Sequence, residues 1–177
     1  MIDEGCVPYP RRRLYQFLTY PMIVLYVLLG IFLWRTGVLY FVIYTALFVF
    51  VAVFMSYVCV HWGCPYVGKF APCVGGFCLP SSQMARLLKN VKKTESRYNL
   101  FITLAYISFF GIILFPMYFL FVQGIGYLIG YLVIVLAYGT AFMLLICPVC
   151  ATRNVCPGGQ TSDQLFNLFG WKNPTAE

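Results

Sequence analysis

The sequence predicts an all-α, polytopic membrane protein whose four transmembrane helices form two hairpins, with Cys-rich loops on the cytoplasmic side. Three observations predict this fold class: an apolar composition, four long uncharged segments, and basic residues gathered on one side of those segments. The 177-residue chain is 62% hydrophobic and 10% charged, whereas about 25% of a typical soluble domain is charged. So short a chain cannot supply a polar shell around four buried helices, which excludes the soluble alternative.

Each uncharged segment is long enough to cross a bilayer, because a spanning helix needs about 20 apolar residues. We expect the helices at about 14–34, 38–60, 98–122 and 125–146. The first segment is too long for a signal peptide, and no small-residue cleavage site follows it. The two turns on the side away from the cysteines are very short, at Arg35 to Gly37 and at Gln123 to Gly124.

The basic residues predict the orientation of the helices. Of the 12 lysines and arginines, only Arg35 falls on the side of the short turns. The others are Arg11, Arg12, Arg13, Lys69, Arg86, Lys89, Lys92, Lys93, Arg97, Arg153 and Lys172. The positive-inside rule then puts both termini and the central loop in the cytoplasm, and we expect the inner membrane of a prokaryotic cell. This one-sided charge fits attraction to anionic lipid, and no nucleic-acid partner is expected.

Four further segments complete the single membrane domain, 1–177. A Cys-rich loop covers 59–80, an amphipathic helix about 81–93, a Cys-rich tail 147–159, and an interfacial tail helix about 161–171. The first surface helix is predicted from apolar residues at helical spacing, namely Met84, Leu87, Leu88 and Val91. It could lie on the membrane surface or pack on the cytoplasmic face of the protein itself. The tail helix could likewise lie at the interface or dock a partner subunit.

All the cysteines fall on the basic side of the predicted helices. They are Cys6, Cys59, Cys64, Cys73, Cys78, Cys147, Cys150 and Cys156. The cytoplasm keeps thiols reduced, so clustered cysteines there bind metal or do redox chemistry more often than they form structural disulfides. The eight thiols are therefore predicted to be metal ligands.

The spacings divide the thiols into two four-ligand sites. The loop reads C-x4-C-x8-C-x4-C and supplies Cys59, Cys64, Cys73 and Cys78. The tail reads C-x2-C-x5-C and supplies Cys147, Cys150 and Cys156, with Cys6 as the expected fourth ligand. A crossed partition, with ligands of both segments in one site, stays open.

One or two iron–sulfur clusters are the favoured cofactors, with zinc as the alternative. A zinc ribbon has two C-x2-C knuckles, and this sequence has one. Bacterial iron–sulfur motifs often carry proline after a ligating cysteine, as Cys64–Pro65, Cys147–Pro148 and Cys156–Pro157 do. Dithiol chemistry and soft-metal trafficking remain further alternatives.

Two short stretches carry a family resemblance. "CVHWGCP" (59–65) and "CATRNVCP" (150–157) follow predicted helices. In that architecture the chain resembles the membrane ferredoxin subunits of nitrate and nitrous-oxide respiration, which carry C-x3-C-P after paired helices. The resemblance implies electron transfer between quinol and protein partners. The chain departs from the family in its x4 and x5 gaps, and it lacks the usual two-cluster ferredoxin tail.

Electron transfer is the function that these features favour, within a larger membrane complex. His61 and Trp62 lie at the helix–loop boundary, where His61 could bind a quinone oxygen, a metal or only water. No histidine falls within a predicted span, which excludes a haem with two histidine ligands. A zinc-stabilised structural subunit is the main competing function. No catalytic residues are predicted, and any enzymatic role would be that of an oxidoreductase component.

Overall fold

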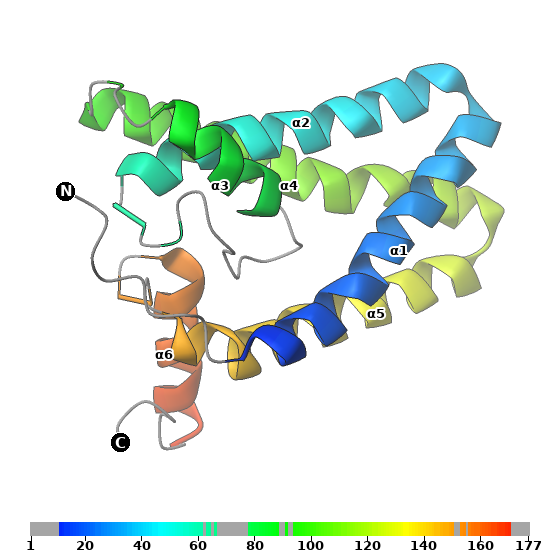
Figure 1. Cartoon of the computed structure of the whole chain (residues 1–177). Coiled ribbons are helices and arrows are strands. Elements are labelled where there is room, and N and C mark those ends of the chain that lie inside the picture. Colours follow the sequence, from blue (N-terminus) through cyan, green and yellow to red (C-terminus); the bar gives the residue numbers. More distant parts are fainter. Residues whose placement is uncertain are drawn as a thin grey trace.

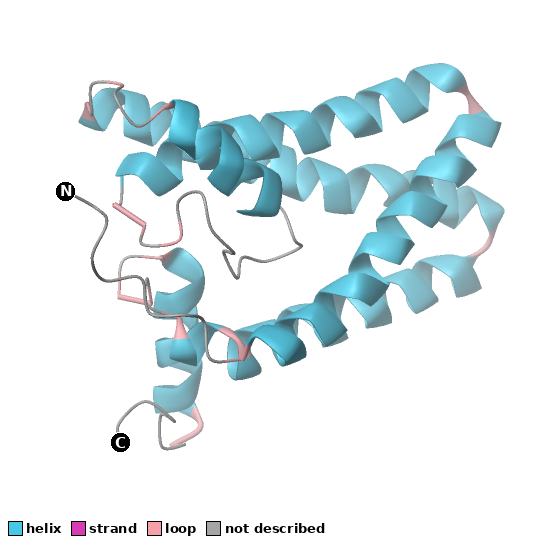
Figure 2. Cartoon of the chain, in the orientation of Figure 1, coloured by secondary structure: helices cyan, strands magenta, loops and turns pink. Residues whose placement is uncertain are grey.

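The computed structural model describes residues 11–61, 63–64, 66, 78–88, 91, 94–150, 153–154 and 156–170. Throughout these residues the regular structure is helical (Figure 2). The elements are α1 (Arg12–Thr36), α2 (Val38–His61), α3 (Cys78–Leu87), α4 (Glu95–Gln123), α5 (Ile125–Leu145), the short 3₁₀ helix η2 (Cys147–Val149) and α6 (Pro157–Leu168).

Among the described residues, four helices are long and apolar enough to cross a membrane, which confirms the predicted number of such helices. They are α1, α2, α4 and the α5–η2 segment Ile125–Val149. Large apolar side chains cover the outside of these helices: Phe17 is 75% exposed and Tyr118 is 69% exposed. A soluble protein rarely exposes apolar area on this scale, and the chain is therefore a membrane protein whose outer surface fits lipid.

Each pair of long helices is joined by a single glycine. Gly37 separates α1 from α2, and its amide donates to the Leu33 carbonyl at 2.9 Å. Gly124 separates α4 from α5 with φ of 148°, which glycine adopts far more readily than other residues. Both turns lie at the same end of the molecule, at the right in Figure 1. We call this the turn end.

The core of the bundle is built between α2 and α4, the most extensively packed pair of helices. The helix α1 contacts α2 and α5, and α5 contacts α4. The buried cluster toward the turn end contains Leu33, Ile112 and Tyr131. A second cluster at the opposite end contains Tyr15, Phe142 and three cysteines. The bundle thus has one apolar core near the turns and a core containing cysteines at its other end.

The two surface helices begin earlier than the sequence indicates. Helix α3 starts at Cys78 rather than near 81, and Ser81 is a buried residue inside it. Pro80 is tolerated because the first turn needs no backbone donor. Helix α6 starts at Pro157 rather than at 161, since proline suits the first helical position. Residues 89–90, 92–93 and 171 of the two predicted helices lie outside the described residues.

The end opposite the turns gathers the ends of many segments. The start of α1, the ends of α2 and α5, and the helices α3 and α6 all lie at the left in Figure 1. Arg11 joins two of them, since its Nη1 donates to the Leu145 carbonyl at 2.6 Å. We call this the thiol end, because every described cysteine lies on the segments that meet there: Cys59, Cys64, Cys78, Cys147, Cys150 and Cys156.

Candidate functional site

The C-x4-C spacing of Cys59 and Cys64 spans the C-terminal cap of α2. The amide of Cys64 donates to the Cys59 carbonyl at 3.0 Å, and the amide of Gly63 donates to the Val60 carbonyl at 3.2 Å. Gly63 has φ of 63°. These bonds and this left-handed glycine define a Schellman motif, in which the first and sixth residues commonly contact each other. Here both residues are cysteines, so the helix end itself forms a dithiol pair.

The two thiols of this pair interact directly, and both are buried, with Cys59 5% and Cys64 7% exposed. A hydrogen bond with the Cys59 thiol lowers the pKa of Cys64, and a backbone hydrogen bond at Tyr66 lowers it further. Hydrogen bonding to the charged form of an acid favours that form. The hydrogen bond therefore favours the thiolate form of Cys64, with the Cys59 thiol as its donor.

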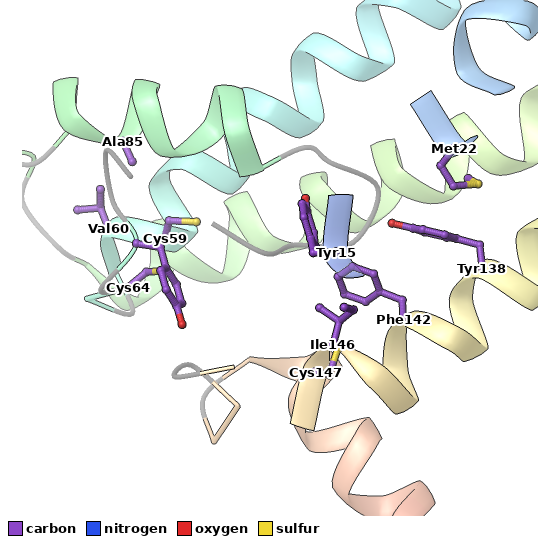
Figure 3. Packing of buried hydrophobic residues seen from close by; sticks show 11 residues of the cluster. Tyr15, Met22, Cys59, Val60, Cys64, Ala85, Tyr138, Phe142, Ile146 and Cys147 are labelled. Atoms are coloured by element: carbon purple, nitrogen blue, oxygen red, sulfur yellow. The ribbon is translucent and has the colours of Figure 1, made fainter. Parts of the chain in front are cut away.

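The C-x2-C spacing of Cys147 and Cys150 forms the turn η2 directly after α5. The amide of Cys150 donates to the Cys147 carbonyl at 3.2 Å. Cys147 is buried in the same cluster as Cys59 and Cys64, and Cys150 packs against that cluster. Figure 3 shows Cys59 and Cys64 on the α2 side of the cluster and Cys147 on the α5 side. The five cysteines with described side chains are all thiols rather than disulfides.

Cys156 is the N-cap residue of α6, and its sulfur and that of Cys147 both approach Gly158. A Cβ atom built on Gly158 would lie 3.7 Å from Cys147 Sγ and 3.9 Å from Cys156 Sγ. Cys156 is also near enough to Cys59 for their charges to interact. Cys156 therefore lies near a cysteine of each predicted site.

Contacts around Arg153 fix the turn that carries Cys156. Gly159 packs directly on the backbone of Arg153, leaving no room for a Cβ atom. The Arg153 side chain pairs with Asp163 at 3.4 Å and donates to the Pro148 carbonyl at 3.2 Å. The buried hydroxyl of Ser162 donates to the Met143 carbonyl at 2.7 Å. The ion pair and these hydrogen bonds therefore hold α6 close to both η2 and the end of α5.

His61 faces α4 in an aromatic stack. Its ring lies parallel to that of Tyr98, with centroids 4.4 Å apart, and Tyr57 stacks on Phe101 at 4.7 Å. His61 Nδ1 is buried and has no hydrogen-bond partner among the described residues. Because His61 is two positions after Cys59, the two side chains point to nearly opposite sides of α2. His61 therefore lies beside the dithiol pair along the chain without joining it. Trp62 lies outside the described residues.

The predicted four-thiol sites are only partly within the described residues. Cys6 and Cys73 lie outside them, as does the side chain of Cys78. Among the described residues, no three histidine, cysteine or acidic side chains are close enough together to hold a metal ion. What the described part supplies is the Cys59–Cys64 pair and the sulfurs of Cys147 and Cys156 around Gly158.

Two features of the site escaped sequence reasoning. The cap at Gly63 could have been found, because a glycine between the cysteines and just past an apolar run indicates a Schellman end. The close packing of Gly159 against the backbone of Arg153 left no local signal in the sequence, since it depends on where α6 docks.

Comparison with known protein families, curated protein sequences and solved structures finds no match for this chain. The function must therefore be argued from the residues and their geometry.

Proposed function

We propose that this protein is an integral membrane subunit that binds an iron–sulfur cluster through cysteines of the thiol end and takes part in electron transfer with quinol or a partner redox protein. The observation that carries the proposal is the gathering of sulfurs from separate segments. The Cys59–Cys64 pair ends α2, and Cys147 and Cys156 meet around Gly158 where α5 gives way to α6. Sulfur atoms from such clusters are the usual ligands of these cofactors.

The donor set fits a thiophilic metal in its chemistry. Metal ligands must be thiolates, and the lowered pKa of Cys64 favours its thiolate form. Cys59, Cys147 and Cys156 are the next candidates, and Cys6, Cys73, Cys78 and Cys150 complete the set. A bound cluster would supply one-electron transfer. The role of the chain would be to hold the sulfurs at the bundle end and to exclude water from them.

The basic residues support an orientation of the helices in the membrane. The basic residues Arg12, Arg86, Arg97 and Arg153 belong to segments that meet at the thiol end, whereas Arg35 lies at the turn end. By the positive-inside rule the thiol end faces the cytoplasm, with both termini. We assign the protein to the inner membrane of a prokaryotic cell, where reduced thiols are maintained on that side.

Quinone contact is proposed at the α2–α4 stack. His61 Nδ1 is a buried nitrogen without a partner among the described residues, and the ring lies flat on Tyr98. A quinone carbonyl accepts a hydrogen bond, and aromatic rings favour its flat ring. A partner subunit is expected at the thiol end, where α6 exposes Leu168 and Phe169.

Metal analysis after anaerobic purification tests the proposal. We expect iron and acid-labile sulfide in comparable amounts, with visible absorption, and loss of both in the variant with Cys59→Ser and Cys64→Ser. Met22→Leu is the matched control, because Met22 is buried in the same cluster without a thiol. Bound zinc, with no visible absorption and no acid-labile sulfide, would support a structural role in place of electron transfer. Absence of any metal would overturn the proposal.

A further inference from the structure

Two hydroxyl groups inside the bundle have no hydrogen-bond partner among the described residues: those of Tyr44 and Thr19. Both residues are 2% exposed. Elsewhere on the helices, small hydroxyl side chains bond to the carbonyl four residues earlier, as Ser56 does to Ala52 at 2.6 Å and Thr103 to Asn99 at 2.8 Å. Thr19 does not make this bond. A buried hydroxyl without a partner is destabilising, and the surrounding lipid offers none.

Tyr44 lies beside two more tyrosines of the bundle interior. Tyr131 and Tyr26 are near enough to Tyr44 for their side chains to interact with it electrostatically. The ring of Phe48 packs edge-on against both Tyr26 and Tyr44, with centroids 5.0 Å apart in each case. The Tyr131 hydroxyl donates to the Ile113 carbonyl at 2.9 Å. Three tyrosines from α1, α2 and α5 therefore lie near one another in the apolar half of the core.

We propose that this tyrosine cluster, made of Tyr26, Tyr44 and Tyr131, binds water inside the membrane-spanning bundle. A buried water needs two to four polar partners, and the three hydroxyls supply them. The Tyr131 oxygen can still accept a hydrogen bond while its proton is held by Ile113. Water is the ligand because an apolar occupant would leave Tyr44 unpaired. This site is independent of the metal proposal.

The tyrosine cluster continues toward the thiol end. Tyr26 and Tyr138 are electrostatic neighbours. Tyr138 and Tyr15 both pack on Phe142, at 5.7 and 6.1 Å between centroids. Tyr15 and Tyr138 share their buried cluster with Cys147, and Thr19 is one helical turn from Tyr15. Tyrosine side chains thus extend from the turn end of the bundle to the cluster that contains Cys147.

Hydroxyl-radical labelling by radiolysis in ¹⁸O water tests the site, because radicals form where water resides. We expect ¹⁸O incorporation at Tyr44 close to that of Tyr127, which is 67% exposed at the start of α5, beside the turn at Gly124. Phe142, which is 1% exposed, is the buried aromatic control and should stay unlabelled. In Tyr44→Phe, labelling of Tyr131 should fall several-fold. Labelling of Tyr44 no greater than that of Phe142 would overturn the proposal.

A thermal-stability measurement distinguishes a hydrated hydroxyl from a dry one. If Tyr44 binds water, Tyr44→Phe removes a hydrogen bond and lowers the Tm. If Tyr44 is dry and unpaired, the same change removes an unsatisfied group and raises the Tm. Tyr118→Phe, an exposed tyrosine of α4, is the control for loss of a hydroxyl on the lipid side. A raised Tm for Tyr44→Phe would contradict the hydrated site even if the protein binds metal as proposed.

Discussion

The amide of Cys64 donates to the carbonyl of Cys59 at 3.0 Å, and a second hydrogen bond joins their side chains. The first bond is the 6→1 bond of a Schellman motif, which explains the four-residue gap. A three-residue gap would put the second cysteine at the glycine position, where φ is 63°. The x4 spacing that departs from the membrane ferredoxin pattern is thus the spacing that pairs two thiols at a helix end.

Replacing Gly63 should weaken the dithiol pair through the backbone. Nothing lies within 4 Å of a Cβ atom added at Gly63, so Gly63→Ala meets no clash. The left-handed conformation alone should lower the free energy of unfolding by about 1 kcal/mol. Gly126→Ala is the matched control: it is equally open but within α5, and should be neutral or stabilising. Thermal unfolding in detergent measures both, and equal effects would argue against the cap.

The reactivity of Cys64 should depend on Cys59. The hydrogen bond lowers the pKa of Cys64, so in metal-free protein its thiolate should form at a lower pH than an ordinary thiol, near 8.5. Cys59→Ala removes the donor and leaves burial, which raises the pKa. The reaction of Cys64 with methyl methanethiosulfonate should then move to higher pH. Cys59→Ser retains a donor and should preserve much of the original profile. An unchanged profile in Cys59→Ala would contradict the pairing.

Neighbouring glycines of α6 should respond differently to alanine. A methyl group at Gly159 collides with the backbone of Arg153 and should destabilise the protein by about 1–3 kcal/mol. A methyl group at Gly158 makes ordinary contacts with Cys147 Sγ and Cys156 Sγ. Gly158→Ala should therefore fold normally but bind less metal, because the methyl group lies against both sulfurs. Unfolding curves and metal content separate these effects, and full metal content in folded Gly158→Ala would contradict a shared site.

Helix α6 should loosen when its contact with α5 is removed. Ser162→Ala leaves the Met143 carbonyl without the 2.7 Å hydrogen bond. We expect a loss of about 1 kcal/mol and faster proteolytic cleavage before α6. Thr103→Ala serves as a control, since the exposed Thr103 bonds only to its own helix, at 2.8 Å. Cleavage rates that match between the two variants would show that Ser162 does not dock α6.

The spans were predictable because lipid imposes one simple requirement. A run of about 20 apolar residues has no other stable arrangement in a short chain, and α2 begins at Val38 as predicted. The starts of the surface helices were harder. Thr161 offers a capping pattern, but Pro157 is already suited to the first helical position, and the helix begins there.

The candidate site was predictable as a group of cysteines but not as a geometry. The cysteine spacing indicated where the thiols gather, because both clusters follow the ends of spanning helices. The meeting of Cys147 and Cys156 at Gly158 depends on how α6 folds back, which no local pattern records. That the Tyr44 hydroxyl has no partner among the described residues likewise depends on tertiary packing. In the sequence, a tyrosine in an apolar run resembles any other aromatic residue.

Mössbauer spectroscopy of protein purified anaerobically from cells grown on ⁵⁷Fe tests the central claim most directly, because every iron atom contributes whatever its oxidation state. We predict the signals of iron tetrahedrally ligated by sulfur, at a stoichiometry of one or two clusters per chain, and their loss when Cys59 and Cys64 are both replaced by serine. Protein that is folded and carries no iron, or iron that persists unchanged in the double variant, would contradict the account.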